Sequence, residues 1–262
     1  MANIARLARE RAEYLRRQTW YAEAGGRKPV GCAAYFSMEF GLGVGLPLYA
    51  GGLGVLAGDF LKGASDMGVP LVGIGLLYNE GYFRQLLDAE GRQREAYPHN
   101  DPTMLPILPV RDSAGGWLRV ELELPGRALS LRVWRAQVSR VPLYLLDSND
   151  PMNSAADRDI TCRLYDAEPE HRLIQEMALG IGGWRLLEAL GVPVDVCHLN
   201  EGHAALVTVE RARSFANRNG ITFEEALWGT KAGNVFTSHT PVSAGFEPCR
   251  PVRRYPSSQP SH

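Results

Sequence analysis

Three glycines in the first quarter of the chain have the spacing of an anion-binding loop. Gly51, Gly52 and Gly54 lie in residues 35–78, which predict an apolar strand, a glycine-rich loop, a helix and a second apolar strand. Glycine tolerates a positive φ and lets the backbone approach a ligand closely. The first turn of a helix also directs free N–H groups and the positive end of its dipole outward. An anion is therefore the ligand that this loop predicts.

Polar side chains follow the predicted strands at several places along the chain. They are Ser37, Glu39, Asn200, Glu201, His203, His239 and Thr240. Ligands of open α/β sheets bind at the carboxyl ends of the strands, so these residues are candidates for one site. Each of them alone could equally cap a helix or stabilise a turn. Their number, beside a glycine loop, favours a functional site.

Two other chemistries are less consistent with the sequence. Residues 52–57 match the dinucleotide fingerprint GxGxxA, but residues 38–50 separate them from the preceding strand, and only Glu80 could serve as the ribose-binding acid. A dinucleotide-binding oxidoreductase is therefore the less favoured alternative. The run HLNEGH at residues 198–203 lacks the HExxH spacing of zinc enzymes, and no further ligand cluster lies nearby in sequence. We expect no metal site.

The elements that must position these residues alternate between strands and helices. Besides the central unit, we expect a helix over 3–24, a β-meander over 105–147, helices over 171–190, 201–219 and 222–228, and strands over 194–199 and 234–238. This alternation predicts an α/β fold with a Rossmann-like, largely parallel sheet and the meander as an insertion.

Composition restricts the partners and the compartment. The 28 basic and 29 acidic residues nearly balance, so no general attraction to nucleic acid or to an anionic membrane is expected. The four cysteines, Cys32, Cys162, Cys197 and Cys249, form no CxxC pair and predict free thiols in a reducing compartment. Neither a signal peptide nor an apolar run near twenty residues is present, which predicts a cytoplasmic protein.

Five segments of residues 35–246 carry a further pattern. The segments are YFSMEFGL, YAGGLGVLAGDFLKGASDMGVPLVGIGLLYNEGYFRQ, RLYDAEPEHRLIQEMALGIGGWR, HLNEGHAAL and FTSHTPVSAGF. They resemble, in the family's order, the amino-terminal half of the α-glucan phosphorylases, the family of glycogen, starch and maltodextrin phosphorylases, and are most similar to the shorter bacterial and archaeal type. An ordered set of this length is far more specific than any single motif.

The resemblance implies that residues 1–246 form the amino-terminal lobe of a two-lobed GT-B glycosyltransferase. The implied reaction is retaining phosphorolysis of α-1,4-glucans to glucose 1-phosphate in glycogen and maltodextrin metabolism, with α-1,4-glucan and inorganic phosphate as substrates. Pyridoxal phosphate would contribute its phosphate group to acid–base chemistry.

The family's motifs also imply roles for individual residues. Gly51, Gly52 and Leu53 would form the loop over the substrate phosphate and the glucosyl unit, and His239 would bind the sugar at the site of transfer. The adjoining sugar pocket would be lined by Glu39, Glu201 and His203, with Asn200 in support.

The last residues depart from the family. The lysine that holds pyridoxal phosphate belongs to the family's carboxy-terminal lobe, so we expect no cofactor-binding residue in this chain. Residues 247–262, EPCRPVRRYPSSQPSH, are rich in proline and serine and predict a divergent, disordered tail. We expect a truncated, frameshifted or split gene product that is inactive alone, with a separately encoded carboxy-terminal lobe as one partner that the sequence leaves open. The rival interpretations are a glucan- or phosphate-binding module and a nonfunctional remnant.

Overall fold

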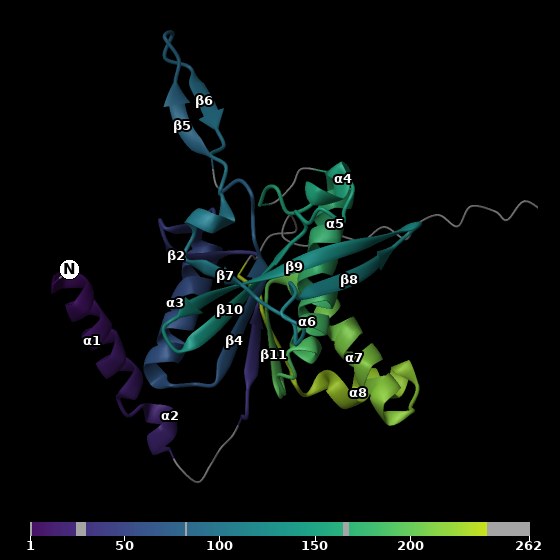
Figure 1. Ribbon diagram of the computed structural model, residues 1–262. Helices are drawn as coiled ribbons and strands as arrows, with labels where there is room; N and C mark the ends of the chain where they lie inside the picture. The colour runs from purple at the N-terminus through teal and green to yellow at the C-terminus, as the bar shows by residue number, and fades with distance from the viewer. Residues whose placement is uncertain (1, 25–29, 82, 165–167, 240–262) are drawn as a thin grey trace, which may run out of the picture.

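The computed structural model describes residues 2–24, 30–81, 83–164 and 168–239 (Figure 1). Thr240, Cys249 and the tail expected over 247–262 lie outside these residues.

One mixed sheet carries the described fold. Its strand order is β12-β11-β1-β4-β10-β9-β7, with β8 paired to β9. The strands are β1 (Ala33–Phe36), β4 (Leu71–Leu76), β7 (Ile107–Pro109), β8 (Arg119–Leu124), β9 (Arg127–Val138), β10 (Val141–Asp147), β11 (Val196–Asn200) and β12 (Asn234–Thr237). Strands β12, β11, β1, β4 and β10 are parallel, and β9, β8 and β7 add antiparallel pairs. The expected α/β fold with a largely parallel sheet is confirmed.

The meander is part of the main sheet and is not a separate insertion. Its last strand, β10, pairs in parallel with β4, with Leu143 opposite Gly73 and Leu146 opposite Leu76. Five of the seven β10 residues are buried, as in a central strand that is covered on both faces. The sequence pattern identified the meander strands but not this pairing.

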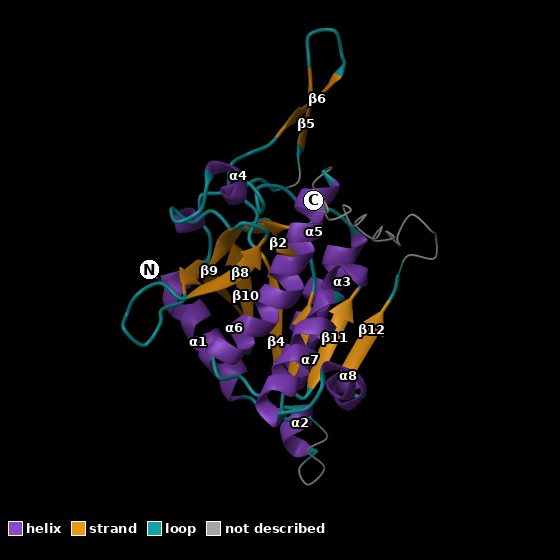
Figure 2. Cartoon of the chain, turned by 90° about the vertical axis from the view of Figure 1, so that its right-hand side faces the viewer, coloured by secondary structure: helices purple, strands orange, loops and turns teal. Residues whose placement is uncertain are grey.

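Helices cover both faces of the sheet (Figure 2). They are α1 (Ala2–Arg16), α2 (Trp20–Glu23), α3 (Gly52–Met67), α4 (Ala155–Arg158), α5 (Pro169–Met177), α6 (Gly183–Ala189), α7 (Leu206–Asn219) and α8 (Phe223–Lys231), with short turns η1 (Pro102–Met104), η2 (Ala178–Gly182) and η3 (Gly202–Ala204). On β4, Gly73 faces Leu61 of α3, and Ile74 faces Gly183 of α6 on the opposite side. None of the described helices combines the length and the apolar character needed to span a membrane.

The expected helix over residues 3–24 is two helices. α1 ends at Arg16, and Thr19 takes an extended conformation before α2 begins. The Arg140 guanidinium donates to the carbonyl oxygens of Tyr14 and Arg17 and stacks over the Tyr14 ring at 4.1 Å. A distant residue therefore binds one carbonyl in the last turn of α1 and another just after it, where the sequence periodicity would continue the helix.

The sequence pattern did not predict two β-hairpins of the structure. β2 (Phe40–Gly43) and β3 (Leu46–Leu48) lie between β1 and α3, in the segment predicted as a loop. β5 (Arg84–Leu87) and β6 (Gln93–Ala96) stand away from the body of the molecule (Figure 1). Almost all residues of β5 and β6 are exposed, so the hairpin has no alternation of apolar and polar residues for the sequence to show.

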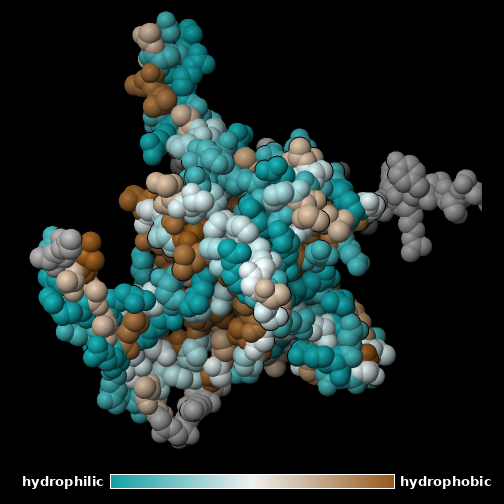
Figure 3. All heavy atoms as spheres, in the orientation of Figure 1, coloured by the Kyte–Doolittle hydropathy of each residue, from teal (hydrophilic) through white to brown (hydrophobic). Residues whose placement is uncertain are grey.

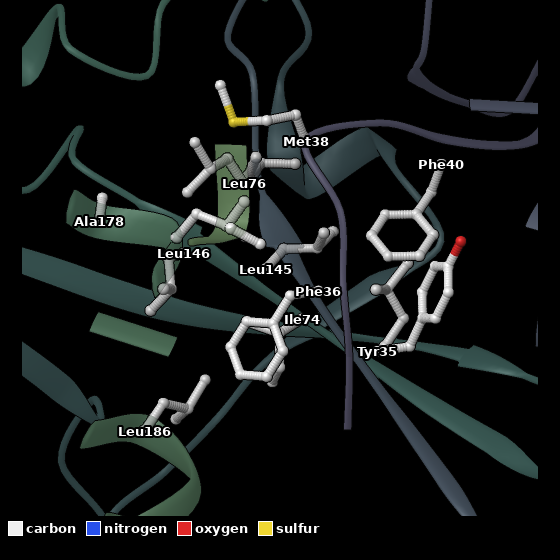
Figure 4. Packing of buried hydrophobic residues seen from close by; sticks show 14 of the residues in the cluster. Tyr35, Phe36, Met38, Phe40, Ile74, Leu76, Leu145, Leu146, Ala178 and Leu186 are labelled. Atoms are coloured by element: carbon white, nitrogen blue, oxygen red, sulfur yellow. The ribbon is translucent and has the colours of Figure 1, made fainter. Parts of the chain in front are cut away.

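The core lies between the sheet and its two helical layers. Figure 4 shows Phe36, Ile74, Leu145 and Leu186 packed together from β1, β4, β10 and α6. Residues 169–189 form one continuous helical segment, with η2 as a π-helical turn in the middle. A Cβ on Gly180 would lie 2.6 Å from the Val207 nitrogen, so the backbone of α7 packs closely against this turn.

Candidate functional site at the carboxyl edge of the sheet

The glycine loop leads into the first turn of α3. Gly51 is the N-cap residue and is extended, with φ −154° and ψ −158°. Gly51, Gly52 and Gly54 all lack a positive φ, which corrects that part of the expectation. The helix begins at Gly52, so the N–H groups of Gly52, Leu53 and Gly54 precede the first intrahelical donor, the Val55 N–H that binds Gly51 O at 3.2 Å.

The three glycines differ in their surroundings. A Cβ on Gly51 or Gly52 would meet no protein atom within 4 Å, so both positions face open space. A Cβ on Gly54 would collide with Tyr49 Cβ and lie 2.8 Å from Glu39 Oε2. Gly54 therefore serves packing inside the protein, whereas Gly51 and Gly52 leave room on the outside of the loop.

Glu39 holds the entry to the loop. Its side chain is only 3% exposed, and its Oε2 accepts from the Ala50 N–H at 2.8 Å and the Gly51 N–H at 3.2 Å. A carboxylate at this place also interacts favourably with the positive end of the α3 dipole. Glu39 thus has a clear structural contact with the backbone, and its predicted contact with a sugar stays a prediction.

Ser37 and Asn200 bring the ends of β1 and β11 together. The two strands are parallel neighbours with Phe36 opposite Leu199, so the next residues in each chain direction lie side by side. Asn200 Nδ2 donates to Ser37 Oγ at 3.1 Å, and both residues are fully buried. The sheet order therefore places two of the predicted strand-end residues in direct contact.

His239 joins this pair from the end of β12. Its Nε2 lies 2.9 Å from Asn200 Oδ1, and its main-chain N–H donates to Glu201 Oε1. With the Asn200 amide nitrogen donating to Ser37, its Oδ1 faces His239 Nε2 as an acceptor, an arrangement that favours the ring form with its hydrogen on Nε2. In the neutral ring Nδ1 is then an acceptor on an exposed side chain.

Glu201 has an uncommon backbone. Its φ is +68°, and Ser139 is the other non-glycine residue with a positive φ among the described residues. Such conformations are unfavourable for residues with a Cβ and persist where surrounding contacts impose them, often at functional sites. Here the Glu201 N–H donates to Thr237 O at 2.9 Å, and the carboxylate holds the His239 backbone.

Two other histidines lie close by. His203, in η3, places Nδ1 3.6 Å from Glu176 Oε1 on α5. His198 Nε2 is 2.7 Å from Thr237 Oγ1, and its ring contacts Tyr35. Burial, and secondly the charge of His239, lower the pKa of His198. The sequence reasoning gave His198 no role beyond the rejected metal motif.

The structure therefore brings together six of the predicted residues through hydrogen bonds. Glu39 and Gly51 form the loop side, Asn200, Glu201 and His239 form the histidine side, and Ser37 joins the two sides. A pocket of about 190 Å³ lies elsewhere, around the Arg127–Asp157 ion pair and the start of α5. No three His, Cys, Asp or Glu side chains within the described ranges converge as metal ligands.

Comparison with known sequences identifies the family. The chain is 46% identical to glycogen phosphorylase of Mycobacterium tuberculosis over 267 aligned residues, covering 97% of this chain and 31% of the relative. It is 46% identical to maltodextrin phosphorylase of Thermococcus litoralis over 81% of the chain and 26% of the relative, and 35% identical to glycogen phosphorylase of Aquifex aeolicus over 87% and 32%. The chain belongs to the α-glucan phosphorylase family.

The match to these phosphorylases concerns one part of their length. The chain spans about a third of the curated relatives it matches. The similarity also extends beyond residues 35–246, because the alignment with the M. tuberculosis phosphorylase covers 97% of the chain. A family model described as "Protein of unknown function (DUF3417)" matches residues 1–46, which include α1, α2 and β1.

Proposed function

We propose that this chain is the amino-terminal lobe of a GT-B α-glucan phosphorylase and provides one side of its active site. The reaction would be attack of inorganic phosphate on the terminal α-1,4 bond of a glucan. Glucose 1-phosphate would form with retained configuration, and the shortened glucan would leave with the bridging oxygen. The printed names of the relatives, glycogen phosphorylase and maltodextrin phosphorylase, support this substrate class.

One observation carries the proposal. The glycine loop and His239 are connected by hydrogen bonds at the carboxyl edge of adjacent parallel strands, although 188 positions separate Gly51 from His239 (239 − 51). This edge is where ligands of open α/β sheets bind. An anion-binding helix start beside an imidazole acceptor suits a substrate pair of phosphate and sugar.

The residues divide into ligand-contacting and backbone-holding groups. The N–H groups of Gly52 and Leu53 would bind phosphate oxygens, aided by the α3 dipole. His239 Nδ1 would accept from a sugar hydroxyl. Glu39 and Glu201 fix the main chain next to these groups, and their contacts with the sugar, like that of His203, are further proposals.

The described residues do not provide a covalent site for pyridoxal phosphate. Lys62 pairs with Asp59 at 3.3 Å and stands ten residues, about 15 Å, along α3 from Gly52. Lys231 lies over the Trp228 ring at the end of α8, just before β12 begins at the opposite edge of the sheet. We propose that the cofactor would be held by the carboxy-terminal lobe.

Exposed apolar side chains support a covering lobe. Figure 3 shows apolar residues at the surface of the body and on the β5–β6 hairpin. The large apolar side chains that are exposed on α3 and β12 are Val55, Leu56, Phe60, Met67, Val235 and Phe236. Since β12 is the edge of the sheet, its exposed side chains lie where a further element could pack.

Titration of the ¹⁵N-labelled chain with inorganic phosphate and with maltoheptaose tests the proposal. Phosphate should shift the amide signals of Gly52 and Leu53, and maltoheptaose should shift the imidazole signals of His239. Gly115 and Gly126, in turns remote in sequence, provide control amides, and chloride at equal ionic strength controls for salt. If neither ligand shifted the amide signals of the loop or the imidazole signals of His239, the site assignment would be wrong.

A further inference from the structure

Ser37 occupies the junction between the two sides of the candidate site. It is fully buried directly after β1, and its hydroxyl makes three contacts. It donates to Glu39 O at 2.9 Å and accepts from Asn200 Nδ2 at 3.1 Å and from Glu39 N at 3.3 Å. A serine hydroxyl has one hydrogen and two lone pairs, so its capacity is fully used.

On the loop side, Ser37 fixes the backbone from which the Glu39 carboxylate reaches Gly51. Tyr78 reinforces this segment, because its hydroxyl donates to Met38 O at 2.9 Å. Complete burial, and secondly the Glu39 charge, raise the pKa of Tyr78 well above its ordinary value, so the phenol stays protonated. The position of the loop therefore depends on a short, rigid segment anchored by Ser37.

On the histidine side, the hydrogen bond to Ser37 fixes the orientation of the Asn200 amide. With Nδ2 donating to Ser37, Oδ1 faces His239 Nε2 and selects the ring form that carries hydrogen there. Removing the hydroxyl would remove the reason for this amide orientation. The two ends of the network thus share one buried atom.

We propose that Ser37 is a positioning residue that couples the glycine loop to His239. A substitution that breaks the hydrogen bonds at one end then changes the structure at the other end. A role of this coupling in catalysis rests on the proposed function. The coupling itself is a property of the free chain. The alternative is that Ser37 is a buried serine that contributes only to the stability of the fold. Ser148 offers the matched comparison, since it is equally buried at the end of β10 and bonds Thr161 at 3.0 Å.

The experiment compares Ser37→Ala with Ser148→Ala by NMR of the free chain. The first reporter is native-state hydrogen exchange of the Gly51 amide, and the second is the pair of imidazole nitrogens of His239. Ser37→Ala should speed Gly51 exchange about tenfold, the factor expected for loss of one hydrogen bond. It should also replace the single Nε2–H ring form by a mixture. Ser148→Ala should leave both reporters unchanged at a similar loss of thermal stability.

The coupling is wrong if Ser37→Ala changes stability as Ser148→Ala does and leaves either reporter unmoved. Should Ser37→Ala fail to fold, His239→Ala tests the same path from its exposed end, and faster Gly51 exchange is expected. Unchanged Gly51 exchange in that variant would refute the coupling. Failure of the phosphate and maltoheptaose titrations would instead overturn the proposed function, whatever the exchange data show.

Discussion

Asn200 is the last residue of β11, His239 comes two residues after the neighbouring strand β12, and a 2.9 Å hydrogen bond joins Asn200 Oδ1 to His239 Nε2. The asparagine is completely buried, whereas the histidine side chain is exposed. A rigid interior group therefore orients a surface group, which is the arrangement that a preorganised binding site needs.

Asn200→Leu should destabilise the chain by about 1–3 kcal/mol, because it leaves the buried Ser37 hydroxyl without one of its partners. Urea unfolding measures this change. Asn219→Leu is the control, since Asn219 is exposed on α7 and its side chain donates to Phe215 O on the same helix; its effect should stay within about 0.5 kcal/mol. Equal stability of the two variants would contradict the network described above.

Gly52→Ala and Gly54→Ala should separate function from stability. The Gly52 variant should keep its melting temperature, because the new methyl group meets open space and no positive φ is involved. The Gly54 variant should melt at a clearly lower temperature, because its methyl group would collide with Tyr49. Thermal unfolding of both variants is the measurement, and a reversed order would show that the loop has been assigned incorrectly.

The Gly52 variant also has an expected effect on catalysis. In a chain completed with the carboxy-terminal remainder of the M. tuberculosis phosphorylase, Gly52→Ala should lower turnover about a hundredfold, the effect of displacing reacting groups by about 1 Å. Steady-state kinetics of glucose 1-phosphate release measure it. Turnover close to that of the unmodified completed chain would mean that the loop is only a structural turn.

Acid should weaken the fold partly through His198. Its folded pKa lies below the ordinary value of 6.5 because the ring is half-buried. The neutral form is therefore favoured by folding, and this contribution is complete above about pH 6.5 and is lost as the pH falls through the folded pKa. Urea midpoints between neutral pH and pH 5 should fall less steeply for His198→Gln than for the unmodified chain. If the urea midpoints of the two proteins fell equally with pH, His198 would not contribute to the loss of stability in acid.

The chain alone should neither cleave glucan nor bind pyridoxal phosphate as an aldimine. Neither of the two lysines among the described residues, Lys62 and Lys231, belongs to the candidate site. Incubation with glycogen, phosphate and the cofactor should give no glucose 1-phosphate and no aldimine absorbance. Turnover by this chain alone would disprove the requirement for a second lobe.

Local patterns sufficed for most elements. The periodicity of α7, the glycine that follows it at position 220 and the Thr222–Glu225 spacing of the α8 capping box are all local features that the sequence displays. The end of α1 and the place of β10 depend on partners far away in the chain, namely Arg140 and β4. Sequence periodicity contains no information on such contacts, and both expectations failed there.

The same distinction applies to the site. The residue types at the strand ends predicted which side chains gather at the carboxyl edge, and the family motif assigned them roles. Sheet order was needed to see that Ser37 touches Asn200, and tertiary packing was needed to separate Gly54 from Gly52. A glycine kept for packing and a glycine kept for a ligand look alike in the sequence.

The most direct test of the central claim is phosphate-dependent release of glucose 1-phosphate from glycogen by the completed chain. We predict turnover by the unmodified completed chain, and a loss of about tenfold or more in His239→Ala, the factor for one hydrogen bond to the substrate. His171→Ala, on α5 beside the separate pocket, should retain full activity. A folded, cofactor-loaded completed chain that releases no glucose 1-phosphate, or a His239→Ala variant with undiminished turnover, would contradict the account.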